Sequence, residues 1–378
     1  MRRRSKPRGD FGPTRMKEYI PGWLGVLSVF LLLPAVGLAG TRGGEDADAA
    51  RADAPGPGSE GEATWIEEEL APVEPARSGY HGSSASFESG RAGFQLEVGE
   101  VVIPYRVMAV TALPGETLEL RIGGSGRAEH GGSGDFVVRD ADGPLGGAEG
   151  RWSWSAPEEP GVHPLRISSV SHADSIHLNV LVLHPRSEIR GGSLNGYRIG
   201  EYRNGGAASV EPPPGFLEVG IRERDILVSP HFTLEQFLCK QPGSPAYLAV
   251  TEALVLKLEA ILEAVNEAGI DAPTLHVMSG FRTPHYNRAI GNQTDLSRHL
   301  WGDAADIFID TTGDGMMDDL NGDGRVDDRD AEILYRIVES VEGAGEPHVH
   351  DGGLALYRTN AVRGPFVHVD ARGHPARW

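Results

Sequence analysis

The sequence predicts a multidomain chain in which an all-β sandwich is followed by an α+β domain. The chain has 378 residues, more than the roughly 100–200 residues of a usual single domain. Apolar and polar residues alternate in several segments between residues 80 and 188, which is the pattern of strands with one buried face. From about residue 225 onward, apolar residues at helical spacing alternate with short apolar runs, which predicts helices together with buried strands.

The first 79 residues are expected to lie outside these domains. Residues 1–17 hold seven basic side chains and one acid, and residues 19–41 carry no charge. Such an uncharged run is just long enough to cross a bilayer core of about 30 Å, and the basic segment before it fits the cytoplasmic side. We predict a basic cytoplasmic head over 1–18, then a cleaved signal peptide or a retained inner-membrane anchor over 19–41. Either form of export places the remainder in the periplasm or cell envelope; a buried helix of a soluble protein is the alternative.

Charge and cysteine content limit which partners and which kinds of site the chain can have. Residues 41–75 carry ten acids and two arginines, so residues 42–79 are predicted to be a disordered acidic tether. The whole chain has a formal net charge of −19, which disfavours a nucleic-acid partner. Cys239 is the single cysteine, so no internal disulfide can form. Its apolar neighbours indicate a buried small hydrophobe rather than a catalytic thiol.

Residues 80–188 are predicted to form the β-sandwich. The alternation is clearest in Phe94 to Val98, Leu118 to Ile122 and Ile176 to Val182. Glycine and proline turns separate these segments, as in a small sandwich. The stretch from Trp152 to Ile167 resembles the late strands of immunoglobulin-like bacterial modules. Because the region has no set of metal ligands or nucleophiles, we expect a spacer or binding module, followed by a linker over 189–224.

Residues 225–378 are predicted to form the α+β domain, with a small antiparallel sheet. Apolar residues at helical spacing predict a helix over 245–268, which Gly269 ends. A second helix is expected around Ile333 to Val341. Short apolar runs predict strands at 275–278, 304–309 and 366–369.

Two of these predicted strands carry residues that could bind a metal ion. Asp306 lies in the run 304–309, seven positions after His299, and His368 lies in the last strand. A carboxylate in an apolar run is costly to bury unless it is paired or metal-bound. Zinc accepts imidazole nitrogen and carboxylate oxygen, and catalytic zinc keeps three protein ligands. Taken singly, each histidine could instead be a hydrogen-bonded core residue.

Several motifs in residues 225–378 follow the order of a known family. They are Ser279–Pro284, Tyr286–Asn287, Ser297–Asp306 and Val367–Asp370. Together they resemble the zinc D-Ala-D-Ala carboxypeptidase family, whose zinc-site fold is shared with lysostaphin-type peptidases and hedgehog signalling domains. The tail, with Asp370–Gly373 and Arg377–Trp378, is most similar to the murein endopeptidase-like branch.

This resemblance implies a site and a reaction. His299, Asp306 and His368 would be the zinc ligands. Arg282 would hold a substrate carboxylate or carbonyl, and Ser297 would orient the ligand loop or contact the substrate. The expected activity is zinc-dependent hydrolysis of peptide bonds in peptidoglycan stem peptides or cross-links, by a D-Ala-D-Ala carboxypeptidase or a murein endopeptidase.

The general base does not carry over from the family. Pro365 stands where the family has an acid, and Phe366 stands where relatives often have histidine. A base is needed to take a proton from the attacking water. Asp370 is our first candidate for this catalytic role, although it could equally orient a ligand histidine. The further candidates are His348, His350 and Asp351.

The missing base leaves two other hypotheses open. One is a non-catalytic, zinc-containing protein that binds the cell wall or another partner. The other is an adhesion-type protein in which the β-sandwich acts and the zinc domain supports it.

An acidic insertion over 310–330 predicts a structural calcium loop. An EF-hand loop places oxygen ligands at positions 1, 3, 5, 9 and 12, glycine at 6 and a backbone carbonyl at 7. These positions fall, in that order, on Asp319, Asn321, Asp323, Asp327, Asp330, Gly324 and Arg325. Asp330 replaces the usual bidentate glutamate, as in dockerin-like loops. A plain acidic surface insertion is the alternative.

Overall fold

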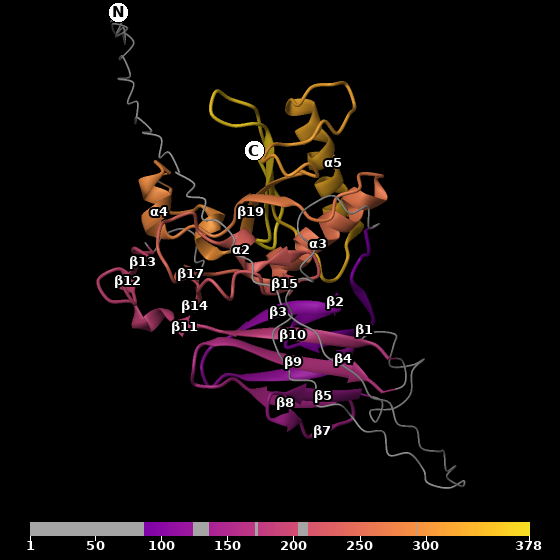
Figure 1. Ribbon diagram of the computed structural model, residues 1–378, viewed down its shortest axis with the longest axis vertical. Coiled ribbons are helices and arrows are strands. Elements are labelled where there is room, and N and C mark those ends of the chain that lie inside the picture. Colours follow the sequence, from indigo (N-terminus) through magenta and orange to yellow (C-terminus); the bar gives the residue numbers. More distant parts are fainter. Residues whose placement is uncertain (1–86, 124–135, 171–172, 203–210, 293) are drawn as a thin grey trace, which may run out of the picture. The chain divides into compact units, whose positions relative to one another are not determined.

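The computed structural model describes residues 87–378 except 124–135, 171–172, 203–210 and 293 (Figure 1). All described residues belong to one compact unit. The predictions for the head over 1–18, the uncharged segment over 19–41 and the tether over 42–79 lie outside the described residues. Within the described part, no helix is both long and apolar enough to span a membrane.

Residues 91–182 form two five-stranded sheets. The first has the order β2-β1-β4-β8-β7, formed by Val101–Tyr105, Arg91–Val98, Thr117–Gly123, Arg151–Ser155 and Gly147–Ala148. The second has the order β3-β10-β9-β5-β6, formed by Val107–Ala112, Ser175–Val182, Gly161–Ser169, Phe136–Asp140 and Gly143–Pro144. Neighbouring strands pair antiparallel, except that β3 and β10 run parallel.

The alternating residues of these strands supply buried faces. In β4, Leu118, Leu120 and Ile122 are buried while the polar residues between them are exposed. Leu118 and Leu120 lie opposite Trp154 and Trp152 of β8, which are also buried. The period-two pattern therefore corresponds to half-buried strands, and the described chain is β-rich with several small sheets. Its likeness to immunoglobulin modules stays a prediction.

Residues 189–224, predicted as a linker, contain strands. The 3-10 helix η2 (Arg186–Glu188) precedes β12 (Ser193–Leu194) and β13 (Tyr197–Arg198), which pair with each other. The next strand, β14 (Gly215–Val219), lies between β11 (His184–Pro185) and β17 (Ala246–Leu248) in a three-stranded sheet. This segment therefore joins its two neighbours through backbone pairing.

The C-terminal part has one five-stranded sheet and most of the helices. The sheet order is β18-β19-β21-β20-β22, formed by His276–Ser279, Ala304–Phe308, Phe366–Asp370, Gly353–Tyr357 and Ala376–Arg377. Only the β20–β22 pair in this sheet is parallel. The remaining elements are β15 (Leu227–Ser229), β16 (Phe232–Thr233), α2 (Leu234–Phe237), α3 (Glu252–Glu267), α4 (Pro284–Ala289), η3 (Arg298–Trp301) and α5 (Asp328–Ala344).

The helix predicted over 245–268 begins later than expected. Residues 246–248 form β17, and α3 begins after Thr251, whose hydroxyl accepts a hydrogen bond from the Leu254 amide. A threonine at this position satisfies an amide that has no partner within the helix. The C-terminal end lies close to the prediction, because α3 ends at Glu267 and Gly269 adopts a positive φ of 86°.

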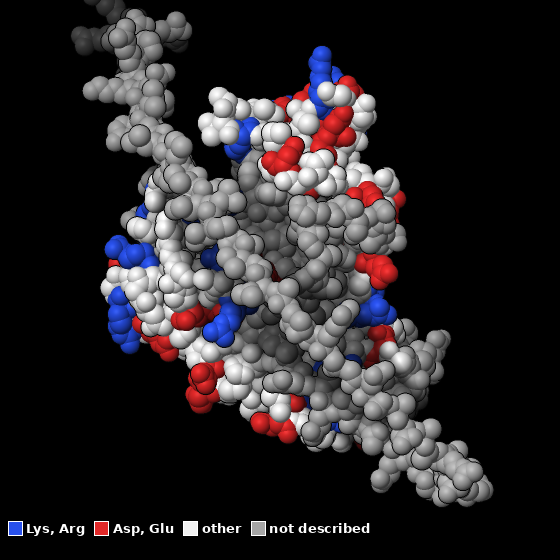
Figure 2. Space-filling view, in the orientation of Figure 1, with Lys and Arg blue, Asp and Glu red and all other residues white. Residues whose placement is uncertain are grey.

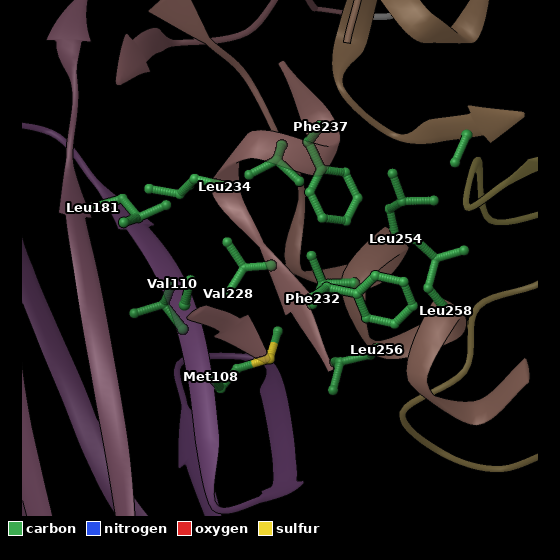
Figure 3. Packing of buried hydrophobic residues seen from close by; sticks show 14 of the residues in the cluster. Met108, Val110, Leu181, Val228, Phe232, Leu234, Phe237, Leu254, Leu256 and Leu258 are labelled. Atoms are coloured by element: carbon green, nitrogen blue, oxygen red, sulfur yellow. The ribbon is translucent and has the colours of Figure 1, made fainter. Parts of the chain in front are cut away.

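Buried apolar residues from both halves of the described chain form one core. Met108 and Val110 of β3 lie next to Val228 of β15 (Figure 3). Asn179 of β10 adds a polar contact, since its side-chain amide donates to the Leu227 carbonyl over 2.8 Å. The sandwich strands therefore pack directly against the C-terminal part.

Two glutamates of helix α3 form hydrogen bonds with residues in the first half of the chain. Glu252 accepts hydrogen bonds from the Thr111 amide and hydroxyl, at 2.6 and 2.8 Å. Glu263 accepts from Arg91 Nε and Nη2, at 2.8 and 2.6 Å. Because the pairing with Arg91 is bidentate, it fixes the orientation of both side chains.

Candidate metal centre

Three side chains from separate segments meet at the C-terminal sheet. His299, Asp306 and His368 are buried, and one ligand atom of each lies within 4.8 Å of the others. Among the described residues, this is the one group of three or more His, Cys, Asp or Glu side chains gathered closely enough to hold a metal ion. The predicted ligands therefore come together.

The fold explains why these three residues meet. Asp306 on β19 lies directly opposite His368 on β21 in the antiparallel pair. His299 belongs to η3, which Gly302 ends with a positive φ of 73°. A side chain at Gly302 would collide with the Ala249 carbonyl, so the close turn that leads into β19 requires glycine.

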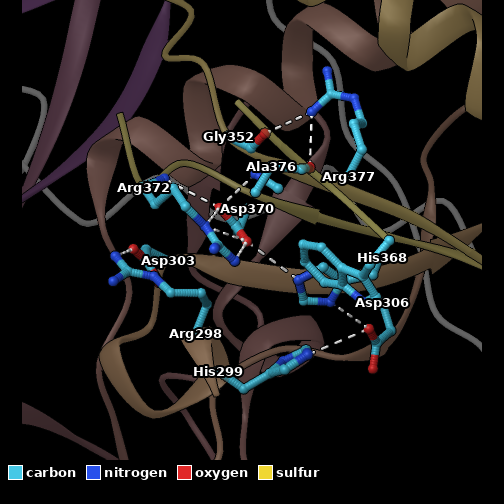
Figure 4. Close-up of polar contacts among 12 residues, drawn as sticks. Arg298, His299, Asp303, Asp306, Gly352, His368, Asp370, Arg372, Ala376 and Arg377 are labelled. Atoms are coloured by element: carbon cyan, nitrogen blue, oxygen red, sulfur yellow. Dashed lines mark hydrogen bonds and ion pairs between the residues drawn. The ribbon is translucent and has the colours of Figure 1, made fainter. Parts of the chain in front are cut away.

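The ligand atoms face one another around Asp306 (Figure 4). His368 Nδ1 lies 2.9 Å and His299 Nε2 lies 3.3 Å from Asp306 Oδ1. The two imidazole rings have their centroids 5.1 Å apart. Two imidazoles and one carboxylate are a ligand set that zinc prefers.

The other nitrogen of each histidine is held by the protein. His299 Nδ1 donates to the Gly280 carbonyl oxygen over 2.7 Å, and His368 Nε2 lies 3.4 Å from Asp370 Oδ2. Metal-binding histidines usually donate their second nitrogen to a carbonyl or carboxylate, which orients the ring and selects the tautomer. The donor set and these outer contacts both fit zinc.

Burial and charge act differently on the three side chains. Burial lowers the pKa of His299, which favours its neutral imidazole. Burial alone would raise the pKa of Asp306, but the imidazoles of His299 and His368 outweigh it and hold that pKa well below its usual range. A deprotonated carboxylate and a neutral imidazole are the forms that coordinate a cation. Burial alone would lower the pKa of His368, but the carboxylates of Asp306 and Asp370 outweigh it and raise that pKa, so a cation must displace a proton there.

Arg282 contacts the centre directly. Its Nη2 donates to Asp306 Oδ2 over 2.6 Å, and its Nε donates to Ser279 Oγ over 2.8 Å. The guanidinium thus holds the Asp306 oxygen that faces away from the histidines. Ser297, the other predicted substrate residue, is half-buried and precedes η3, where its carbonyl accepts a hydrogen bond from the Leu300 amide.

Asp370 is fully buried among donors. Its carboxylate accepts from Arg372 Nε at 2.8 Å and Nη2 at 2.5 Å, and from the Gly353 amide at 2.7 Å. Burial raises the pKa of Asp370, but the contacts with His368 and Arg372 outweigh it and hold that pKa well below the usual range. This environment stabilises an ionised carboxylate that orients His368.

The other candidate bases lie apart from the centre. His350 is exposed, and His348 is buried with its ring edge-on to Tyr105, 6.2 Å between centroids. Asp351 is exposed, and its carbonyl accepts a hydrogen bond from Gly373. Within the described residues, no hydrogen bond or ion pair joins these three side chains to the ligand triad.

Sequence reasoning missed two residues that support the centre. Lys257 of α3 is buried, pairs with Glu342 and donates to the Asp370 carbonyl over 2.7 Å. Arg298 forms an ion pair with buried Asp303, between η3 and β19. A lysine inside the apolar helix 252–267 was the available signal for the first, because a buried ammonium requires partners.

The predicted calcium loop lies outside the triad. The Asp319 carboxylate accepts from the Gly322, Asp323 and Gly324 amides, at 2.9, 3.2 and 2.6 Å. Asp327 and Asp330 form a capping box at the start of α5. The Asn321 side chain accepts from the Asp323 amide, and Arg325 donates its amide to Asp323. Calcium binding here stays a prediction.

The lobe that carries α5 is acidic on its surface. In the space-filling view, several Asp and Glu side chains gather on it (Figure 2).

Two described cavities lie elsewhere. One, of about 750 Å³, is lined by residues including Arg91, Glu263 and Glu346. The other, of about 300 Å³, is lined by residues including Arg298 and Trp301 of η3. None of the triad lines either cavity.

Comparison with known proteins supports the nature of this centre. No curated protein matches the chain. A family model described as Peptidase M15 matches residues 230–318, about a quarter of the chain. The matched segment includes His299 and Asp306 and ends before His368. Residues 230–318 are thus similar to the zinc-dependent peptidases of the M15 family, and together with the triad this supports a metallopeptidase.

Proposed function

We propose that the protein is a zinc-dependent peptidase of the cell envelope that hydrolyses peptide bonds of peptidoglycan stem peptides or cross-links. It would act as a D-Ala-D-Ala carboxypeptidase or as a murein endopeptidase. The observation that carries this proposal is the buried triad, which places two imidazoles and one carboxylate within 4.8 Å of one another. Two of the three ligands lie in the segment similar to M15 peptidases.

The ligands would be His299 Nε2, Asp306 Oδ1 and His368 Nδ1. When bound, zinc supplies a Lewis acid that polarises the scissile carbonyl and makes water more acidic. The chain's own groups orient this site: the Gly280 carbonyl holds His299, and Asp370 holds His368. Fixed ligands reduce the reorganisation needed during the reaction.

Arg282 would serve both the site and the substrate. Two of its nitrogens hold Ser279 and Asp306. Among the hydrogen bonds of the described residues, Nη1 makes none, so it can donate to a substrate carbonyl or carboxylate oxygen. A guanidinium donor directed at such an oxygen stabilises negative charge that develops there.

Asp370 is better suited to orientation than to proton transfer. Arg372 and the Gly353 amide already donate to its carboxylate, and His368 is its third neighbour. A general base needs an oxygen within hydrogen-bond reach of the water that loses its proton. We therefore assign Asp370 to holding His368. The substitution Asp370→Asn tests whether it also acts as a general base.

The cellular location of the protein is also part of this proposal. Residues 19–41 would direct export, and would also anchor the chain in the inner membrane if they are not removed. Peptidoglycan lies outside the inner membrane, so the proposed location gives the protein access to the proposed substrate. N-terminal sequencing of the protein recovered from a cell-envelope fraction would distinguish a cleaved segment from a retained one.

A second candidate function is a zinc-containing protein that binds the cell wall without cutting it. Pro365 stands where the family has an acid, and the Asp370 carboxylate is engaged by Arg372. Both observations leave the attacking water without an assigned base. On this alternative the metal would stabilise the domain.

The test uses the zinc-loaded full-length protein and purified sacculi. We expect mass analysis to find muropeptides shortened by hydrolysis of one type of peptide bond, and His299→Ala to abolish this release. Arg151→Gln, which removes an exposed charge from β8 of the sandwich, is the matched control and should cleave like wild type. Binding to sacculi without any new amino group would contradict the peptidase and favour the binding protein.

A further inference from the structure

A cation beside the centre, other than one paired with a ligand, would attract a substrate carboxylate. Arg282 was the expected cation, but it forms an ion pair of 2.6 Å with Asp306. Its charge is therefore largely balanced within the site. The chain as a whole has a formal net charge of −19, which disfavours the approach of an anionic peptide.

Lys240 lies on the segment that runs beside Arg282. The Phe281 amide donates to the Phe237 carbonyl over 3.0 Å, and the Thr283 hydroxyl donates to Gln241 Oε1 over 2.8 Å. These two bonds flank both Lys240 and Arg282 in their respective segments. The backbones are also in close contact, because a side chain at Gly280 would come within 2.8 Å of Phe237 Cα.

Lys240 differs from the other described lysine. The chain has four lysines, of which Lys240 and Lys257 lie among the described residues. Lys257 is buried and bonded to Glu342 and Asp370. Lys240 is exposed, and none of the hydrogen bonds or ion pairs of the described residues involves its ammonium. It is thus a cation that can bind a ligand without first losing a protein partner.

The charges that act on Lys240 agree with its place on the segment beside Arg282. Partial burial and the positive charge of Arg282 lower the pKa of Lys240, while the negative charge of Asp306 acts in the opposite direction. Arg282 and Asp306 are thus the charged groups that act on this ammonium. One of them is a proposed metal ligand.

We propose that Lys240 binds a carboxylate of the peptide substrate and so selects peptides with a free carboxylate next to the cleaved bond. This inference rests on the proposed peptidase function. Lys240 and the Nη1 of Arg282 would present two donors from adjacent segments. Charge-assisted hydrogen bonds are stronger than neutral ones, so this contact would favour an acidic peptide over its amide.

The test compares two peptides that end in D-Ala-D-Ala, one with a free C-terminal carboxylate and one with a C-terminal amide. For the zinc-loaded full-length protein we expect the carboxylate form to have the lower KM. Lys240→Gln should raise that KM about tenfold, the size expected for losing one charge-assisted hydrogen bond. It should leave kcat and the amide peptide nearly unchanged, and Lys240→Arg should restore most of the preference.

Equilibrium binding of the same peptides by calorimetry separates the two proposals. If wild type binds the carboxylate peptide but cleaves nothing, the peptidase proposal fails and Lys240 is still tested by affinity. Arg151→Gln is the control for a lost exposed charge. Equal affinities of wild type and Lys240→Gln for the carboxylate peptide, with equal zinc content, would overturn the role of Lys240. So would a wild type that binds neither peptide.

Discussion

Two acid-containing regions of the C-terminal part stabilise their carboxylates in different ways. In the triad, Asp306 is buried and meets the imidazole of His299 from η3, seven residues earlier, and that of His368 from β21, 62 residues later. In the loop over 319–330, Asp319 lies nearer the surface and accepts hydrogen bonds from amides three to five residues ahead. The first carboxylate depends on the tertiary fold, whereas the second finds its donors locally.

This difference bears on what each region requires from a metal ion. Around Asp306, metal binding requires both neighbouring imidazoles to be neutral, and their lone pairs then face the carboxylate oxygen. A cation relieves that arrangement. In the loop, backbone amides already satisfy Asp319, Asp323 and Asp330. A metal would add stability there, but the local conformation does not depend on it.

The largest expected effect comes from removing the charge at the buried centre. Asp306→Asn keeps the size of the side chain but loses a negatively charged ligand, so we expect zinc affinity to fall by more than about 100-fold. Peptidase activity should be lost with it. Zinc content after dialysis against a competing chelator measures the change.

Asp319→Asn is the matched control for this variant, because it makes the same substitution in the loop. It should retain zinc like wild type. If Asp306→Asn keeps wild-type zinc affinity, or if Asp319→Asn loses zinc to the same extent, the contrast between the two regions is wrong.

A smaller effect is expected at Asp370, which contacts the proposed ligand His368 and is not itself a proposed ligand. Asp370→Asn weakens the contact that orients His368 and leaves Arg372 without its ionic partner. Loss of such an outer partner typically weakens metal binding about 10–100-fold. A competition titration with a zinc indicator gives the affinity. Unchanged affinity together with lost turnover would contradict orientation and make Asp370 the general base.

The third prediction concerns the stability of the loop without metal. Asp330 is fully buried and accepts from the Leu320, Asn321 and Asp327 amides, at 2.9, 3.2 and 2.8 Å. Asp330→Ala removes a capping contact and leaves buried amides unpaired, so unfolding free energy should fall by about 2 kcal/mol. Urea denaturation in a chelator measures this loss.

Asp323→Ala provides the comparison, because Asp323 is exposed and accepts from the Arg325 amide alone among backbone groups of the described residues. Its effect should stay below about 0.5 kcal/mol. If Asp330→Ala destabilises the protein only when calcium is present, the loop is held by the ion rather than by its own amides.

The same contrast explains what could be predicted from sequence. The triad was predictable because its motifs keep family order and because Asp306 stands out in an apolar strand. The acidic loop could be proposed as a calcium site because EF-hand spacing is local, and calcium binding there stays a prediction. The contacts of Lys257 with Asp370, and of Arg282 with Asp306, depend on how separate segments pack. The start of α3 was missed because the apolar residues Tyr247 and Leu248 fit a strand as well as a helix.

The smallest expected effect is stabilisation of the loop by calcium. Exported calcium modules bind with a Kd of about 10⁻⁴–10⁻³ M. Calcium at about ten times Kd should therefore raise the unfolding free energy by about 1.4 kcal/mol. Thermal unfolding with calcium or with a calcium chelator measures the shift, and magnesium controls for ionic strength. Asp319→Asn should remove most of the calcium response while zinc content stays constant. If calcium leaves wild-type unfolding unchanged at millimolar concentration, the acidic insertion is a surface loop whose own backbone amides hold its carboxylates.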